Sequence, residues 1–141
     1  MSSIITKSEK ETHVFALKMG KNLQGGEVLA LSGELGAGKT VFAKGLALGM
    51  GYEDNISSPT FVIMKVYDLS NNKKIKCFVH VDTYRINSSD GIKEIGLSEY
   101  FKRKDVVTLI EWPENIKEAL PLNVINITIE NINQNSRKIN Y

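Results

Sequence analysis

The fold of this chain is indicated by one stretch, Leu29-Ala-Leu-Ser-Gly-Glu-Leu-Gly-Ala-Gly-Lys-Thr-Val41. Within it, Gly33 is followed by Gly38, Lys39 and Thr40 at the spacing of a Walker A phosphate-binding loop. Such a loop curls tightly enough to surround a phosphate chain with backbone N–H groups, which glycines permit because they have no Cβ. The lysine then brings positive charge to the β- and γ-phosphates, and the threonine hydroxyl can bind Mg²⁺. The stretch therefore predicts a site for a nucleoside triphosphate.

The residues on either side of the loop favour the same interpretation. Val28 to Leu31 is a short apolar run typical of a buried strand, and Val41 to Leu48 has the pattern of a helix. This is the strand, loop and helix order that the motif requires, and the helix N-terminus adds partial positive charge facing the anion. The alternative, a glycine-rich turn that binds no ligand, requires the four fixed positions to coincide by chance.

The composition is that of one ordinary globular domain covering residues 1–141. The chain is 42% hydrophobic and 24% charged, which is typical of a folded protein with its own core. Its net charge of +2 does not predict a nucleic-acid-binding face. No apolar run has the length of a signal-peptide core or a membrane span, so we expect a cytoplasmic protein. The single cysteine, Cys77, excludes an internal disulfide.

The remaining pattern predicts alternating helices and strands. Ser8-Glu-Lys-Glu11 is a capping box that begins a helix ending near Gly25. Strands are expected at 28–31, 60–69, 76–82, 106–110, 124–130 and 137–141, and further helices at 39–48, 97–101 and 113–120. The strands at 60–69 and 76–82 should form an antiparallel hairpin. We expect an α/β fold, a P-loop NTPase-like three-layer sandwich with a parallel central sheet and antiparallel hairpins at its edges.

Two carboxylates follow predicted strands and could complete the site. Glu111 comes directly after the apolar strand at 106–110, the usual position of an acid in the Mg²⁺ shell, and Asp82 ends the strand at 76–82. We favour Glu111 for the metal and Asp82 for water positioning, although the sequence leaves open which of the two orients the water. The alternative for either residue is an ordinary salt bridge at a strand end.

Several neighbouring residues have two interpretations each. Ser58-Pro-Thr60 could sense the γ-phosphate through its hydroxyls, with Thr60 taking part in catalysis, or could simply form a turn before a strand. Arg85 could stabilise charge in the transition state or pair with a nearby carboxylate. His80 has no second His or Cys at ligand spacing and is interpreted as a strand residue. Trp112 is interpreted as a core residue, but its position next to Glu111 makes contact with the site worth testing.

Taken together, these motifs resemble those of the TsaE (YjeE) family of small ATPases, which bacteria require for threonylcarbamoyladenosine modification of tRNA. The resemblance is carried, in order, by Gly33-Glu-Leu-Gly-Ala-Gly-Lys-Thr40, Ser58-Pro-Thr-Phe61, His80-Val-Asp-Thr-Tyr-Arg85 and Glu111-Trp-Pro113. These motifs span most of the chain, and no central motif departs from the family pattern.

The resemblance implies a Mg²⁺-dependent ATPase that uses ATP rather than GTP. It implies a metal shell that includes Thr40 and Glu111, a switch-like role for residues 58–60, and catalytic roles for Lys39 and Asp82. Nucleotide contacts are implied for Thr12, Gly33, Glu34, Leu35, Gly36, Ala37, Gly38, Lys39, Thr40, Val41 and Arg137. The implied partners are TsaB and TsaD homologues, with which the protein would support formation of N6-threonylcarbamoyladenosine at position 37 of ANN-decoding tRNAs. Contact with tRNA is implied only indirectly, and no membrane is involved.

Two other functions stay open from the sequence. A small-molecule kinase could use the same loop, but the chain has only Lys102, Arg103 and Lys104 in place of an arginine-rich lid. A nucleotide-gated protein-binding module, in which turnover is incidental, would use residues 58–60 and Trp112 as a surface. A GTPase is disfavoured, because Asn72-Lys-Lys-Ile75 lacks the aspartate of a guanine-reading motif.

Overall fold

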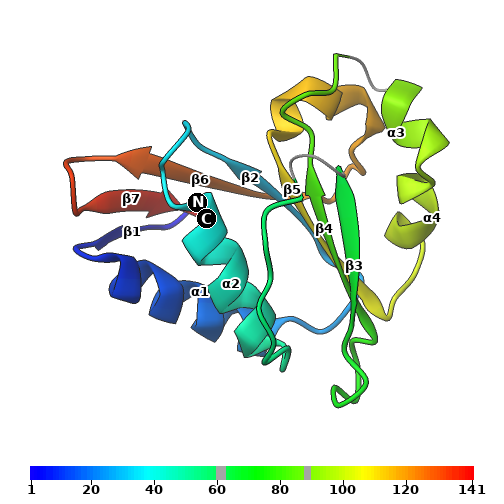
Figure 1. Ribbon diagram of the computed structural model, residues 1–141, viewed down its shortest axis with the longest axis horizontal. Coiled ribbons are helices and arrows are strands. Elements are labelled where there is room, and N and C mark those ends of the chain that lie inside the picture. The colour runs from blue at the N-terminus through cyan, green and yellow to red at the C-terminus, as the bar shows by residue number, and fades with distance from the viewer. Residues whose placement is uncertain (60–62, 88–89) are drawn as a thin grey trace.

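The computed structural model describes residues 1–59, 63–87 and 90–141. Seven strands of these residues form one sheet in the order β1-β7-β6-β2-β5-β4-β3 (Figure 1). The strands are β1 (Ser3–Thr6), β2 (Val28–Ser32), β3 (Met64–Asp68), β4 (Cys77–Asp82), β5 (Val106–Glu111), β6 (Ile125–Asn131) and β7 (Arg137–Asn140). The helices are α1 (Glu9–Asn22), α2 (Lys39–Gly49), α3 (Asp90–Glu94), α4 (Leu97–Phe101) and the 3₁₀ helix η1 (Pro113–Ala119).

The sheet has a parallel centre and antiparallel edges, as the sequence predicts. Strands β6, β2, β5 and β4 run parallel, while β3 pairs antiparallel with β4 and β7 pairs antiparallel with β6. The part of the predicted hairpin at 60–62 lies outside the described residues. The edge strand β1 is not predicted from the sequence, because its four residues show no alternation: the first three are exposed and only Thr6 is buried. It pairs antiparallel with β7.

Helices cover both faces of the sheet, so the fold is a three-layer sandwich. On one face, Leu29 and Leu31 of β2 are buried against Phe42 and Leu46 of α2. On the other face, alternate strand residues are buried together with residues of α3, α4 and η1; this second core contains Val28, Val79, Val81, Ile92, Leu97, Val106, Ile110 and Ile116. No helix among the described residues combines the length and the apolar character needed to cross a membrane.

The first helix begins at the residue that the sequence indicates. Ser8 is the N-cap of α1 and its hydroxyl accepts a hydrogen bond from the N–H of Glu11 at 3.1 Å. The Glu11 carboxylate accepts from the N–H of Lys7 at 2.7 Å, one residue before the cap. Side chains therefore satisfy one N–H of the first turn and the N–H just before the cap, an arrangement similar to a capping box.

Helices α1 and α2 pack closely because glycines lie at their contact. A Cβ built on Gly45 would lie 2.4 Å from the carbonyl oxygen of His13, and one on Gly20 would lie 2.3 Å from that of Leu46. Helix α2 begins at Lys39 at the end of the glycine loop, and Figure 1 shows α1 beside it. The close packing therefore sets the position of the helix that carries the candidate phosphate-binding residues.

Candidate functional site

The glycine loop lies between β2 and α2, where the sequence places it. Gly36 and Gly38 adopt the left-handed backbone conformation, with φ of 78° and 102°. A Cβ at either position would meet nothing within 4 Å, so it is the backbone conformation that favours glycine here. Gly33 is different, because its Cβ would lie 2.9 Å from the carbonyl oxygen of Ile129 on β6. The loop is thus held against the sheet at its start and open at its tip.

The ammonium group of Lys39 is directed onto the loop itself. Its Nζ donates hydrogen bonds to the carbonyl oxygens of Gly33 at 2.6 Å and Glu34 at 2.9 Å. The same Nζ lies 4.6 Å from the centroid of the Trp112 ring, within the range of a cation–π interaction. The residue is only 6% exposed.

Burial lowers the pKa of Lys39, and nearby carboxylates act in the opposite direction. Removal from water disfavours the charged form, whereas the negative charges of Glu111, Asp82 and Glu114 favour it. The lysine and these carboxylates therefore influence one another electrostatically in a single site.

The two candidate acids end neighbouring parallel strands. The register of β4 and β5 pairs Asp82 with Glu111, so both carboxylates lie at the same edge of the sheet. They are 4% and 3% exposed. One oxygen of Asp82 accepts a hydrogen bond from the N–H of Tyr84 at 2.9 Å, which holds this side chain in place.

Glu111 has a hydrogen-bond partner that the sequence does not indicate. His80 lies on β4, two residues before Asp82 and on the same face, and its Nε2 donates to Oε1 of Glu111 at 2.8 Å. His80 is 1% exposed and stacks on the ring of Phe78. It is a strand residue, as predicted, but its ring contributes to the site through Glu111.

The segments that follow β4 and β5 are joined by hydrogen bonds. The backbone N–H of Thr83 donates to the carbonyl oxygen of Glu111 at 3.1 Å, and its hydroxyl donates to the carbonyl oxygens of Glu111 and Trp112. Trp112 has a φ of 58°, a conformation that non-glycine residues rarely adopt. The side-chain amide of Asn115 donates to the carbonyl oxygen of Thr83 at 2.9 Å. We call this set of bonds the Thr83 clasp.

The loop, the lysine and the two acids line one cavity of about 360 Å³, within the usual size range of ligand pockets. We call it the phosphate-side cavity. Its lining residues are Glu9, Leu35, Gly36, Gly38, Lys39, Thr40, Val41, Ser58, Asp82, Tyr84, Glu111 and Trp112. The structure therefore brings together Lys39, Thr40, Asp82 and Glu111, while Thr60 lies outside the described residues. Arg85 is exposed and is not among the residues lining this cavity.

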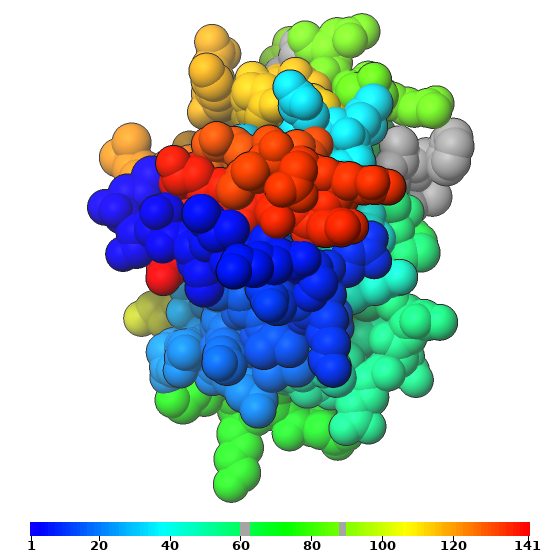
Figure 2. Space-filling view, turned by 90° about the vertical axis from the view of Figure 1, so that its left-hand side faces the viewer, coloured from blue at the N-terminus to red at the C-terminus, as the bar shows by residue number. Residues whose placement is uncertain are grey.

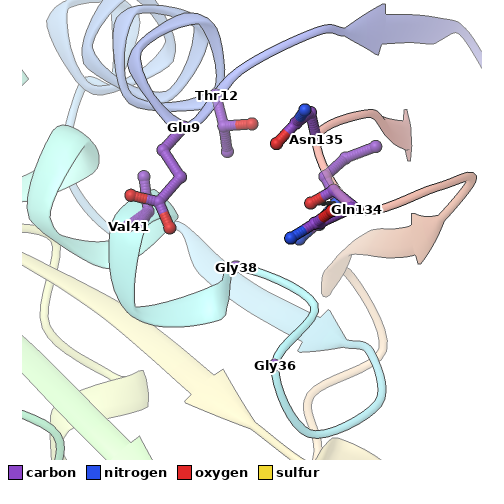
Figure 3. Close-up of a pocket in the computed structure, with 8 residues that line it drawn as sticks. Glu9, Thr12, Gly36, Gly38, Val41, Gln134 and Asn135 are labelled. Carbon is purple, nitrogen blue, oxygen red and sulfur yellow. Dashed lines mark hydrogen bonds between the residues drawn. The ribbon is translucent and has the colours of Figure 1, made fainter.

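A second cavity lies on the other side of the loop, between the start of α1 and the hairpin of β6 and β7 (Figure 3). We call it the hairpin-side cavity. It is lined by Glu9, Thr12, Gly36, Gly38, Val41, Gln134, Asn135 and Arg137. Figure 3 shows the Glu9 side chain on one side and Gln134 and Asn135 on the other. Glu9, Gly36, Gly38 and Val41 line both cavities, so the two cavities adjoin at the glycine loop and the start of α1.

Thr12 and Arg137 lie at the hairpin-side cavity, but their polar groups already have protein partners. The hydroxyl of Thr12 is hydrogen-bonded to that of Thr6 at 2.7 Å, and Thr12 is 2% exposed. Arg137 donates through Nε to the carbonyl oxygen of Ala37 at 2.9 Å and through a terminal nitrogen to carbonyls of the hairpin, including Asn133. Arg137 therefore connects the hairpin to the glycine loop. The space-filling view shows the hairpin packed above the first strand and helix (Figure 2).

Comparison with known proteins gives one consistent result. The family model of the threonylcarbamoyl adenosine biosynthesis protein TsaE matches residues 6–139. The tRNA threonylcarbamoyladenosine biosynthesis protein TsaE of Bacillus subtilis is 38% identical over 136 residues, which cover 96% of this chain and 82% of that protein. Its counterpart from Treponema pallidum is 34% identical over 135 residues, 96% of each chain. The crystal structure of Bacillus subtilis YdiB matches with a TM-score of 0.79 at 34% identity, covering 98% of this chain and 82% of that one.

Proposed function

The chain belongs to the TsaE family of tRNA threonylcarbamoyladenosine biosynthesis proteins, and we propose that it serves this process as a Mg²⁺-dependent ATPase. The observation that carries the proposal is the phosphate-side cavity, in which a glycine loop with Lys39 faces the buried carboxylates Asp82 and Glu111. A glycine-rich turn of purely structural use would not place a lysine and two buried acids in one cavity.

The residues of the loop suit a triphosphate. The open tip at Gly36 and Gly38 leaves room for phosphate oxygens, and the N-terminus of α2 presents backbone N–H groups there. The N-cap position of α2 is Gly38, which has no side chain to occupy those groups. Lys39 would exchange the carbonyl oxygens of Gly33 and Glu34 for phosphate oxygens, which carry more negative charge.

The donor set also suits Mg²⁺. Among the described residues, no cluster of three or more His, Cys, Asp and Glu side chains could hold a metal ion. Mg²⁺ bound with a nucleotide does not require one, because it uses one or two protein ligands together with phosphates and water. We assign the hydroxyl of Thr40 and the carboxylate of Glu111 to this role, since both line the phosphate-side cavity. When bound, the ion would neutralise charge that develops on the phosphates.

Asp82 is assigned to the attacking water. Its carboxylate lines the phosphate-side cavity, and a hydrogen bond from the N–H of Tyr84 at 2.9 Å orients it there. Glu111 also lines this cavity. Its Oε1 accepts from the side chain of His80, whereas Asp82 accepts from a backbone N–H. This division of roles would make the loss of Asp82 affect turnover more than nucleotide binding.

The nucleoside is assigned to the hairpin-side cavity, which adjoins the loop (Figure 3). Its lining offers carboxylate and amide groups from Glu9, Gln134 and Asn135, which can hydrogen-bond the base and the ribose hydroxyls. Arg137 supports this wall by holding the carbonyl oxygen of Ala37. In this assignment Arg137 braces the wall of the cavity.

The proposed partners are TsaB and TsaD homologues, with tRNA contacted only indirectly. Two apolar side chains at the mouth of the phosphate-side cavity are well exposed, Leu35 at 69% and Tyr84 at 46%. Exposed apolar groups around a site suit a protein partner that covers it. The net charge of +2 gives no comparable support for direct tRNA binding.

The test is ATP hydrolysis by the purified protein, with and without TsaB and TsaD homologues. We expect slow turnover alone, a clear increase with the partners, and loss of turnover in both Lys39→Ala and Glu111→Ala. Matched controls are Lys44→Ala, an exposed lysine on α2, and Glu118→Ala, an exposed glutamate on η1.

Three results would count against the proposal. If the partners leave the rate unchanged, the coupled ATPase loses its support. If Glu111→Ala still supports tRNA modification while it binds nucleotide, the protein acts as a nucleotide-gated binding module. Rapid phosphate transfer to a small acceptor would instead identify a kinase.

A further inference from the structure

We propose that His80 is the positioning residue for Glu111: its Nε2–H holds one carboxylate oxygen, so that the other is available in the phosphate-side cavity for the metal. The inference rests on the proposed function, because it concerns the Mg²⁺ ligand assigned there. His80 does not itself contact the nucleotide and acts through Glu111 alone.

The arrangement follows from the sheet. Strands β4 and β5 are parallel neighbours, with Asp82 opposite Glu111 and His80 opposite Leu109. Residues two apart on a strand point to the same face, so His80, Asp82 and Glu111 share the face that is covered by α2. The hydrogen bond between His80 Nε2 and Glu111 Oε1 therefore joins two rigid strands rather than two loops.

The lack of a partner for His80 Nδ1 indicates that the ring is placed for the bond that Nε2 makes to Glu111. Nδ1 of His80 is buried and has no hydrogen-bond partner among the described residues. A buried polar atom without a partner destabilises the fold, so a ring placed here for stability alone would be better replaced by an apolar one. The polar contact that the ring does make is to Glu111 Oε1.

Glu111 needs such a partner because the positively charged Lys39 lies in the same site and attracts its carboxylate. Glu111 and the ammonium of Lys39 attract each other, and this attraction raises the pKa of Lys39 against the larger effect of burial. A Glu111 side chain without its bond to His80 could turn toward Lys39, which would occupy the lysine and remove the carboxylate from the metal. The hydrogen bond from the His80 ring holds Glu111 away from this contact.

Residues that orient metal ligands in this way usually contribute about 10–100-fold to metal affinity. The measurement is the affinity for a non-hydrolysable ATP analogue, by calorimetry, across a series of Mg²⁺ concentrations. We expect His80→Phe to need at least about tenfold more Mg²⁺ for the same gain in affinity, while its affinity without Mg²⁺ stays as in the wild type.

Two conservative variants separate positioning from packing. The amide nitrogen of glutamine reaches the place of Nε2, whereas that of asparagine reaches the place of Nδ1, so His80→Gln should restore the Mg²⁺ dependence and His80→Asn should not. His13→Gln is the matched control, because His13 is the other histidine of the chain and lies on α1. Melting temperatures of all variants report whether each one folds.

Nitrogen NMR of the wild-type histidine rings gives a readout that needs no variant at His80. We expect a proton on Nε2, the nitrogen that is bonded to Glu111, and the His13→Gln protein leaves a single imidazole to assign. A proton on Nδ1 alone would overturn the inference, as would equal Mg²⁺ dependence in wild type and His80→Asn. If the wild type itself binds the analogue equally with and without Mg²⁺, both the proposed metal site and the inference are refuted. Mg²⁺ dependence in the wild type that the variants do not alter overturns the inference alone.

Discussion

Replacing Gly45 with alanine should separate α1 from α2 and destabilise the protein. The added Cβ would lie 2.4 Å from the backbone oxygen of His13 and 2.9 Å from the Cβ of Ala16, and ordinary contact begins at 3.4 Å. A backbone oxygen cannot rotate away, so the helices must move apart by about 1 Å. Overpacking of this kind costs about 3 kcal/mol, and alanine returns about 1 kcal/mol through its better helix propensity. The net loss is therefore about 2 kcal/mol, which for a chain of this size lowers Tm by about 7 °C.

The assay is thermal and urea unfolding followed by circular dichroism, with Gly91→Ala as the control. Gly91 also lies in a helix, α3, but its Cβ would meet only a side-chain carbon of Ile86 at an ordinary 3.7 Å. Gly91→Ala should therefore be neutral or slightly stabilising. If Gly45→Ala is as stable as Gly91→Ala, the helices are not held at a distance that only glycine permits, and the reasoning is refuted.

Three further predictions concern the site. The chain has one tryptophan, Trp112, whose ring is in contact with the Lys39 ammonium, so binding of ATP should change its fluorescence, and the change should be absent in Lys39→Ala. Burial lowers the pKa of Lys39 in the folded protein below its ordinary value of 10.5. Between the folded and the ordinary pKa, the unfolded chain binds more protons than the folded chain, so the free energy of unfolding should rise with pH. Urea titrations below pH 10.5 should show a smaller rise in Lys39→Ala. Arg137→Met removes the hydrogen bond to the Ala37 carbonyl and should weaken ATP binding by at least about tenfold in calorimetry, since a charged hydrogen bond contributes roughly 1.5–3 kcal/mol. Lys138, the exposed residue next to Arg137, provides the control. Equal ATP affinities of Arg137→Met and Lys138→Met would exclude a bracing role.

Most of the fold could be predicted because its signals are local. The strand before the glycine loop, the helix after it and the cap at Ser8 each depend on residues within one or two turns of chain. The edge strand β1 could not be predicted in this way. Its exposed Ile4 and Ile5 show no alternation, and it is a strand because β7, more than 130 residues later, pairs with it.

The parts of the candidate site that depend on residue type and spacing along the chain were predictable. Glycine, lysine and threonine at fixed spacing, and acids after apolar strands, identify the residues that now line the phosphate-side cavity. The bond from His80 to Glu111 was not predictable, because it depends on the register between β4 and β5, which no local pattern sets. The same holds for Arg137, whose partners are main-chain carbonyls that carry no sequence signal.

The Thr83 clasp has a consequence for local opening. The backbone N–H of Thr83 donates to the Glu111 carbonyl, and the backbone N–H of Asn115 donates to the Trp112 carbonyl. The side-chain amide of Asn115 donates in turn to the carbonyl of Thr83. Breaking one of these bonds removes support from the others, so the ends of β4 and β5 should open as one cooperative unit. Their amide protons should then exchange with solvent at a common rate, and a motion that begins beside Asp82 would reach η1 through these bonds.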